Sequence, residues 1–339
     1  MAALLELKAL TVELPTPNGW IRPVNDLTLC IEGGQSIGLV GESGSGKTML
    51  SLALVGLLPA GASVSGEARL RARDGAKNLA AKLDQKEWRA VRGREIAMIF
   101  QEPMTSLNPV MRIGAQVEEA VRAHEPETAR AEVARRALEA LRLAAVPEPE
   151  LRAKQFPHQL SGGLRQRAMI AMALAAEPRL LIADEPTTAL DVTVQRQILD
   201  LLLKLKNELK LGLLFITHDL GVVAQVADRV AVMYAGRIVE EGPAREVLRG
   251  PRHPYTQGLL KASPTLLRGT LTPIPGAVPP LRALPPGCAF EPRCPLRRDD
   301  CQLAVPELRA ASREHAARCV LVEPWSTDGR ISCAGPVLP

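Results

Sequence analysis

The chain has 339 residues, enough for one large domain or two to three smaller ones, and 46% of them are hydrophobic. No apolar run approaches the roughly 20 residues that cross a bilayer, and no basic segment followed by a long apolar core opens the chain, so we expect a cytoplasmic protein without a membrane span or secretion signal. The net charge is +5, but eleven Lys or Arg against seven Asp or Glu in residues 251–339 account for most of it, and only 3% of residues are aromatic, so we expect no nucleic-acid partner.

The N-terminal part of the chain leads to a phosphate-binding loop. Short apolar runs predict strands at residues 4–7, 10–14, 27–31 and 36–40. Directly afterwards, residues 41–48 match the pattern G-x-x-x-x-G-K-S/T at every fixed position, and an apolar helical segment follows. In such a loop Lys47 reaches the β- and γ-phosphates and the Thr48 hydroxyl binds Mg²⁺. We therefore predict a site for ATP and Mg²⁺ that consists of Gly41, Glu42, Ser43, Gly44, Ser45, Gly46, Lys47 and Thr48.

Beyond the loop, the sequence predicts an edge strand at 64–70, a helix at 82–91 and a buried strand at 96–100. The buried strand ends at Gln101, and ligands of α/β proteins bind at the carboxyl ends of strands. Gln101 can contact Mg²⁺ and an attacking water there, although the residue taken alone equally fits a turn. An amphipathic helix is predicted at 128–143, and we assign it to the core of a helical insertion without chemistry of its own.

Another candidate anion site opens a predicted helix at residue 161. Ser161 is a favourable N-cap, and Gly162 and Gly163 leave backbone N–H groups uncovered at the helix N-terminus. The alternative is an N-cap that only starts a helix, and for this pattern taken by itself that alternative is favoured.

Two strands farther along end in polar side chains. Residues 180–184 form an apolar run that ends in Asp184 and Glu185, which would be costly to bury together without a cation. We expect Asp184 to hold Mg²⁺ and Glu185 to polarise a water molecule. The run 213–217 ends before His218, which we interpret as a sensor of the γ-phosphate, although a lone histidine is more often structural.

This ordered set of motifs resembles the ATP-binding subunits of ABC transporters across roughly residues 4–250. The resemblance implies an α/β fold with an ABC-type P-loop NTPase core, an antiparallel β subdomain and a helical subdomain at about 101–160. It also implies a head-to-tail dimer, in which the signature of one subunit closes over the ATP of the other. The residues concerned are Ser161, Gly162, Gly163 and Gln166, with Asp191 in the adjacent D-loop.

The same resemblance gives roles to the polar residues at the strand ends. It makes Glu185 the general base, His218 the γ-phosphate switch and Gln101 the link to the membrane subunits. The adenine contact departs from the family pattern, because Asn18 stands where other members carry an aromatic residue and Trp20 lies two residues away. From the extent of this resemblance, the first domain is expected to span residues 1–250.

Residues 251–339 are expected to form a separate extension. This segment holds fifteen of the 28 prolines, which predicts an irregular appendage. Its cysteines have the spacing Cys288-x5-Cys294-x6-Cys301-x17-Cys319. Cytosolic disulfides are rare, and this spacing lacks paired C-x2-C units, so chemistry alone leaves zinc, an iron–sulfur cluster and four reduced structural thiols open.

The extension is similar to that of the dipeptide, oligopeptide and nickel branch of the family. The similar segments are His253-Pro-Tyr-Thr, Ile274-Pro-Gly and Cys288-Ala-Phe-Glu-Pro-Arg-Cys-Pro, together with residues 101–109. The resemblance implies a 4Fe–4S cluster on Cys288, Cys294, Cys301 and Cys319. Cys333 matches no ligand of that arrangement.

The resemblance thus implies a peripheral protein at the cytoplasmic face of the inner membrane. As an ATPase and translocase subunit it would power import of di- or oligopeptides, or of related solutes such as glutathione or nickel complexes. Its implied partners are a second ABC ATPase subunit, two transmembrane permease subunits and an extracytoplasmic solute-binding protein. The alternative is a soluble ABC ATPase acting on nucleic acid or the ribosome. That class commonly carries tandem ATPase units or a long coiled coil, and neither occurs in this sequence.

Overall fold

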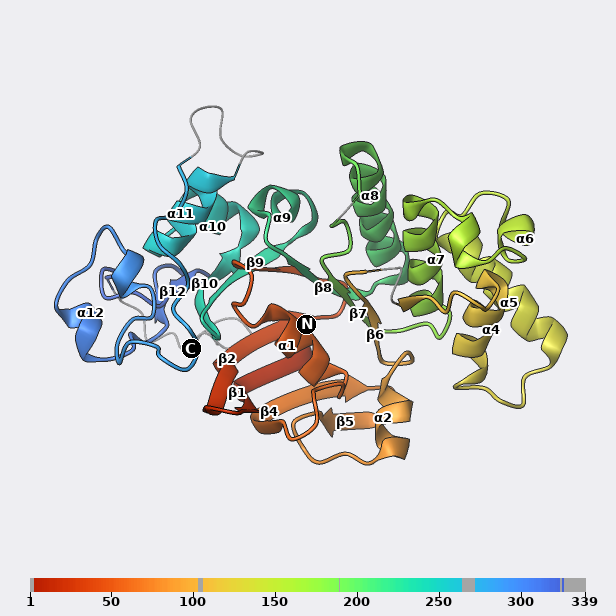
Figure 1. The fold of residues 1–339 in the computed structure, drawn as a ribbon, viewed down its shortest axis with the longest axis horizontal. Coiled ribbons are helices and arrows are strands. Elements are labelled where there is room, and N and C mark those ends of the chain that lie inside the picture. Colours follow the sequence, from red (N-terminus) through yellow and green to blue (C-terminus); the bar gives the residue numbers. More distant parts are fainter. Residues whose placement is uncertain (1–2, 103–105, 189, 264–271, 324, 326–339) are drawn as a thin grey trace.

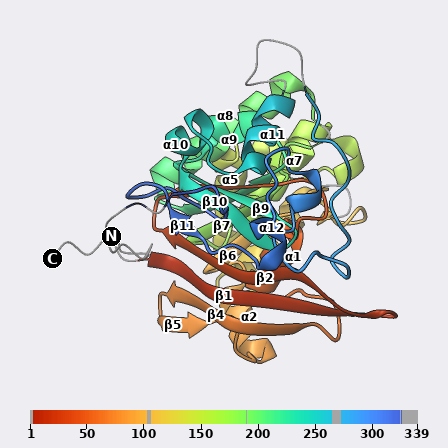
Figure 2. The same cartoon turned by 90° about the vertical axis from the view of Figure 1, so that its left-hand side faces the viewer.

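The computed structural model describes residues 3–102, 106–188, 190–263, 272–323 and 325. Two sheets organise the described residues: a small antiparallel sheet and a larger sheet that is mostly parallel. Figure 2 shows the antiparallel sheet beneath the larger sheet, with most helices on the opposite side. Cys333 and residues 103–105 lie outside the described ranges.

The antiparallel sheet has the strand order β2-β1-β4-β5. The runs predicted at 4–7 and 10–14 are one strand, because the chain continues through Ala9 in the left-handed conformation (φ 48°) with a shift in register. The predicted edge position of 64–70 is wrong, since β4 pairs with β1 on one side and β5 on the other. The bounds are β1 (Ala3–Thr16), β2 (Gly19–Glu32), β4 (Ser63–Ala72) and β5 (Gly75–Asn78).

The larger sheet has the order β11-β12-β10-β9-β3-β8-β7-β6. The strands from β9 to β6 in this order run parallel, so their carboxyl ends meet at one edge of the sheet. Two short strands of the extension continue the sheet beyond β10, which integrates the extension more closely than its proline content predicts. The bounds are β3 (Ser36–Val40), β6 (Ile96–Ile99), β7 (Leu180–Asp184), β8 (Gly212–Thr217), β9 (Arg229–Tyr234), β10 (Arg237–Pro243), β11 (Arg309–Ala310) and β12 (Ala316–Ala317).

The helices fall into three groups along the chain (Figure 1). Helix α1 (Lys47–Leu54) contacts both sheets. Helix α2 (Gln85–Val91) comes directly after β5 in the chain. A helical region contains α4 (Ile113–Arg122), α5 (Arg130–Leu143), α6 (Pro149–Arg152), the 3-10 turn η1 (Pro157–Gln159) and α7 (Gly162–Leu174). The others are α8 (Val192–Leu209), α9 (Leu220–Val226), α10 (Ala244–Arg249), α11 (Pro254–Ala262), η2 (Glu291–Arg293) and α12 (Asp300–Leu303).

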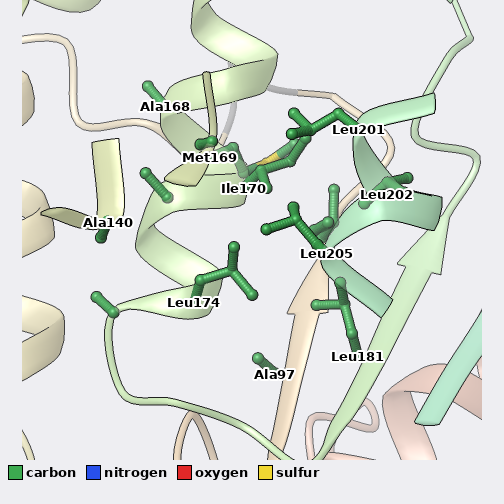
Figure 3. Packing of buried hydrophobic residues seen from close by; sticks show 14 of the residues in the cluster. Ala97, Ala140, Ala168, Met169, Ile170, Leu174, Leu181, Leu201, Leu202 and Leu205 are labelled. Atoms are coloured by element: carbon green, nitrogen blue, oxygen red, sulfur yellow. The ribbon is translucent and has the colours of Figure 1, made fainter. Parts of the chain in front are cut away.

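Three large hydrophobic clusters hold these parts together. One joins the antiparallel sheet to α1 and the larger sheet, and another joins the larger sheet to the helical region. Within the latter, α7 packs between α5 and α8 above β6 and β7, as Figure 3 shows for Met169, Ile170, Leu174, Leu201, Leu202, Leu205, Ala97 and Leu181. The third cluster packs Tyr255 and Phe290 of the extension on β9 and β10. The α/β fold expected for an ABC-type ATPase, with its antiparallel sheet and helical part, is therefore confirmed.

In the parts of the chain that the structure describes, no helix combines the length and the apolar character that crossing a membrane requires.

Candidate active site

The loop of residues 41–48 connects β3 to α1 at the carboxyl edge of the larger sheet. Gly46 has a φ of 107°, and a Cβ there would lie 1.8 Å from the carbonyl oxygen of Pro23. A Cβ at Gly41 would lie 2.2 Å from the carbonyl oxygen of Met233. Glycine is therefore required at both positions, because other parts of the chain lie directly against the loop.

The side chain of Lys47 folds back over this loop. Its Nζ donates to the carbonyl oxygen of Gly41 at 2.7 Å and to that of Glu42 at 3.0 Å. Burial lowers the pKa of Lys47, while the negative charges of Glu185, Asp184 and Glu42 oppose that shift. A buried ammonium group at the centre of such a loop is well placed to bind phosphate oxygens.

Asp184 ends strand β7 beside the loop. Its Oδ2 accepts a hydrogen bond from the Ser51 hydroxyl at 3.4 Å, whereas Oδ1 is buried and has no hydrogen-bond partner among the described residues. Burial raises the pKa of Asp184, and the neighbouring Thr48 hydroxyl and Lys47 ammonium oppose the rise. A buried carboxylate oxygen without a partner, next to a threonine hydroxyl, fits the oxygen ligands that Mg²⁺ prefers.

Glu185 brings together the residues that sequence analysis selected as catalytic. Its Oε2 accepts from the Gln101 amide at 3.3 Å and from the Thr188 hydroxyl at 2.9 Å, and its Oε1 lies 3.3 Å from Nδ1 of His218. The backbone of Glu185 is in the left-handed region (φ 46°), and its N–H donates to the carbonyl oxygen of Ile216 at 2.9 Å. Strand ends β6, β7 and β8 thus deliver one carboxylate, one amide and one imidazole to a single point.

The Ser161 segment lies on another element. Ser161 caps α7 by accepting from the backbone N–H of Leu164 at 3.4 Å, and Asp191 caps α8 by accepting from that of Val194 at 2.9 Å. A Cβ at Gly163 would lie 2.8 Å from Val194, so the glycine lets α7 approach α8 closely. Gln166 is buried on α7, and its amide nitrogen has no hydrogen-bond partner within the described ranges.

The four cysteines of the extension line one small pocket. Cys288, Cys294, Cys301 and Cys319 all border it, and the backbone N–H of Cys288 donates to the carbonyl oxygen of Cys301 at 2.7 Å. Burial raises the pKa of the Cys288 thiol to about 11 and also raises the pKa values of Cys294 and Cys319. Within the described parts of the chain, however, no group of three or more His, Cys, Asp or Glu is arranged to hold a metal ion. The thiols therefore converge on one space without adopting a metal-binding arrangement.

The extension also contacts the phosphate-binding loop. The guanidinium group of Arg293 forms two hydrogen bonds with the Glu42 carboxylate, at 2.7 and 3.0 Å. The backbone N–H of Glu42 donates to the Tyr255 hydroxyl at 2.9 Å. The loop is thus bound by residues that follow it by more than two hundred positions.

Known proteins share both halves of this architecture. The family described as ABC transporter matches residues 24–188, and the family described as the oligopeptide/dipeptide transporter C-terminal region matches residues 239–301. A protein of Brucella melitensis that is named as a peptide import ATP-binding protein is 50% identical over 327 residues, which cover 94% of this chain and 96% of that protein. The chain belongs to the ABC transporter family.

Other relatives of this ABC transporter subunit agree. The oligopeptide transport ATP-binding protein OppD of Escherichia coli K12 is 48% identical, and the alignment covers 90% of this chain and 89% of OppD. A bacterial ABC transporter cassette solved as a dimer has a TM-score of 0.62 and 30% identity, and the match covers 71% of this chain and 99% of the cassette. The resemblance to the ATP-binding subunits of this importer family, and the activity of a transport ATPase, are thereby confirmed.

The sequence indicated much of the cluster around Glu185. It did not indicate the contact of Thr188 with Glu185, or those of Arg293 and Tyr255 with Glu42. Thr188 lies on the turn that Glu185 begins, so a hydroxyl three residues beyond the carboxylate was a usable local signal. Arg293 and Tyr255 carried no such signal, because their partner Glu42 is 251 and 213 positions away. Contacts over such separations are created by the fold rather than by a local motif.

Proposed function

We propose that this chain hydrolyses ATP at the loop of residues 41–48 to drive import of di- or oligopeptides through separate permease subunits. Related small solutes, such as glutathione or nickel complexes, belong to the same proposal. The names of the relatives support the peptide class. The observation that carries the proposed chemistry is the Glu185 carboxylate, held by Gln101, Thr188 and His218 beside a phosphate-binding loop.

In the proposed mechanism, Glu185 accepts the proton of the water that attacks the γ-phosphate. Gln101 orients that water and carries the link to the permeases, and His218 contacts the γ-phosphate while Glu185 holds its ring. A base must lie within hydrogen-bond reach of the proton that it takes, and the three side chains already meet at one oxygen pair. Their common position therefore supports assigning all three to one step.

The loop residues bind the triphosphate in this proposal. Gly41, Glu42, Ser43, Gly44, Ser45 and Gly46 provide the backbone of the cradle, and Lys47 contacts the β- and γ-phosphates. Thr48 and Asp184 would hold Mg²⁺, which when bound neutralises negative charge on the phosphates. The unpartnered Oδ1 of Asp184 supports that assignment.

We propose that a second ABC ATPase subunit, identical or paralogous, completes the site. Its ATP would be covered by Ser161, Gly162, Gly163 and Gln166 of this chain, with Asp191 nearby. The dimeric state of the similar cassette supports this assembly, as does a second related cassette described as a dimer bound to ADP and Pi. The uncovered start of α7 suits an anion supplied by another molecule.

An apolar groove supports docking of the permeases at the cytoplasmic face of the inner membrane. The groove has a volume of about 580 Å³ and lies between β6 and α7, and its lining includes Met98, Phe100, Met169 and Met172. Phe100 directly precedes Gln101, so a permease segment in the groove would contact the residue next to the one that binds Glu185. An extracytoplasmic solute-binding protein completes the proposed importer.

We also propose that Cys288, Cys294, Cys301 and Cys319 hold a 4Fe–4S cluster. Their convergence on one pocket supports a shared ligand, although the thiols as placed do not form a metal-binding group. Such a cluster takes four thiolates as ligands. Anaerobic purification with iron, sulfide and zinc analysis tests the assignment: about four irons and four sulfides per chain support it, and one zinc without sulfide refutes it.

Reconstitution tests the transport function. The chain is combined with its permeases and partner ATPase in vesicles, and peptide uptake and ATP hydrolysis are measured together. Hydrolysis that rises with peptide-loaded binding protein supports the proposal. Hydrolysis that responds to RNA or DNA and ignores the permeases overturns it in favour of a soluble ABC ATPase.

A further inference from the structure

Glu42 is the residue at which the extension meets the phosphate-binding loop. Its backbone N–H is bound by the Tyr255 hydroxyl at 2.9 Å, and its carboxylate is bound by both terminal nitrogens of Arg293. Its carbonyl oxygen accepts from Nζ of Lys47 at 3.0 Å. One loop residue therefore joins the proposed phosphate-binding lysine to two side chains from beyond residue 250.

The Arg293 side chain is buried and has several contacts besides Glu42. Its side chain is 4% exposed, and Nε donates to the carbonyl oxygen of Pro275 at 2.9 Å. The same guanidinium also donates to the Tyr234 hydroxyl at 3.3 Å and lies against the rings of Tyr234 and Phe290. A guanidinium fixed on so many sides presents Nη1 and Nη2 to Glu42 in one geometry, as bidentate pairing requires.

The pairing with Arg293 also neutralises the negative charge of Glu42. Glu42 is an acidic side chain within a loop proposed to receive a triphosphate, and an uncompensated carboxylate there would repel the phosphates. Arg293 neutralises this carboxylate from the side of the extension, whereas Lys47 contacts only the backbone carbonyl of Glu42. The positive charge that balances the Glu42 carboxylate thus comes from Arg293, outside the loop.

The position of Arg293 depends on the cysteine segment. It ends η2, which lies between Cys288 and Cys294. The backbone N–H of Glu291 donates to the carbonyl oxygen of Cys288, and that of Cys294 donates to the carbonyl oxygen of Glu291. The turn that presents Arg293 is thereby built into the wall of the cysteine pocket.

We infer that Arg293 is a positioning residue for the phosphate-binding loop, through which the C-terminal extension sets the affinity of this subunit for Mg-ATP. The inference rests on the proposed nucleotide site. Arg293 acts on the nucleotide only through Glu42, by cancelling the charge of its carboxylate. Loss of Arg293 therefore weakens nucleotide binding mainly because Glu42 is left charged and unpaired.

The test measures binding of a fluorescent trinitrophenyl-ATP with Mg²⁺ to the full chain. Arg293→Gln is expected to weaken binding about tenfold, since it leaves a partly buried carboxylate without its partner. Glu42→Gln combined with Arg293→Gln is expected to bind the probe more tightly than Arg293→Gln alone, because the repelling charge is gone. Arg293→Lys restores the charge without the bidentate geometry and should fall between the two.

Matched variants separate the possible outcomes. Arg297→Gln removes an exposed arginine four positions away and should leave binding unchanged. Equal binding by Arg293→Gln and the unmodified chain overturns the inference, and so does a double variant as weak as Arg293→Gln, which would make Arg293 merely structural. If the unmodified chain binds no probe, or Lys47→Ala binds as well as it, the proposed nucleotide site itself is wrong and the inference falls with it.

Discussion

Nδ1 of His218 lies 3.3 Å from Oε1 of Glu185. The imidazole is exposed, whereas the carboxylate is largely buried, so the histidine covers the outer side of the acid. Gln101 approaches the other oxygen of Glu185 from the end of β6. One carboxylate thus connects the ends of β6 and β8.

Replacing Glu185 with Gln should reduce ATP hydrolysis by roughly 10²- to 10⁴-fold, because the amide cannot accept the proton of the attacking water. Nucleotide binding should remain, since Gly41, Lys47 and Thr48 are untouched. Hydrolysis and binding of ATP by the purified transporter are the measurements. Thr188→Val removes only a hydroxyl that orients the acid and should cost about fivefold. Hydrolysis by Glu185→Gln at a tenth of the normal rate or more would exclude Glu185 as the base.

Replacing Asp184 with Asn should stabilise the nucleotide-free chain while removing activity. Burial raises the pKa of Asp184, so the charged form present at neutral pH opposes folding, and this penalty disappears below the ordinary pKa of 3.8. We expect the melting temperature at neutral pH to rise by roughly 2 °C and the difference to vanish in acid. Hydrolysis should fall about a hundredfold or more, with loss of the Mg²⁺ dependence of nucleotide binding. Ser51→Ala, which leaves the carboxylate charged, is the control. A lower melting temperature for Asp184→Asn would contradict the raised pKa of Asp184, and an unchanged Mg²⁺ dependence would contradict its role in holding Mg²⁺.

Much of the proposed nucleotide site was readable because its residues lie at the ends of strands. The runs before Gln101, Glu185 and His218 are short and apolar, and parallel pairing brings their ends to one edge of a sheet. The sequence predicted that each of these residues lies at the ligand-binding end of a strand, and their hydrogen bonds show that they meet at one point. The loop of residues 41–48 was readable for a different reason, since its glycines, Lys47 and Thr48 form a contiguous sequence pattern.

The extension was predictable only in part. Its prolines suggested an irregular appendage, but β12 pairs with β10 at Glu240 and Glu241. Nothing in a two-residue strand signals that pairing, because its stability comes from the sheet edge that it joins. The burial of Arg293 against Glu42 was equally unreadable, since a charged residue in a proline-rich segment is normally solvated.

The two left-handed glycines of the loop should differ sharply when replaced by alanine. Gly44 has a φ of 79° and no atom within 4 Å of an added Cβ, so Gly44→Ala should cost about 1 kcal/mol of unfolding free energy. Gly46 has a φ of 107° and the Pro23 carbonyl oxygen in the way, so Gly46→Ala should cost more than about 3 kcal/mol. Urea denaturation measures both. Equal costs would mean that the contact with Pro23 is absent in solution.

The buried histidine of the extension should make the protein sensitive to acid. His253 is 1% exposed, and its Nδ1 accepts from the backbone N–H of Tyr255 at 3.0 Å, which requires a neutral ring. Burial lowers the pKa of His253 to about 4 from 6.5, although the negative charge of Glu240 opposes the shift. As the pH falls through 6.5 the unfolded chain takes up a proton that the folded chain refuses, so stability decreases until about pH 4.

We expect about 3 kcal/mol of unfolding free energy to be lost over this interval through His253. His253→Asn should remove that part of the pH dependence, because asparagine can keep the N-cap of α11 and does not titrate. Urea denaturation at several pH values between 7.5 and 4.5 gives the two curves, and His158→Asn, which removes an exposed imidazole, provides the control. Parallel curves for the unmodified chain and His253→Asn would show that His253 takes up its proton as readily in the folded chain as in the unfolded one.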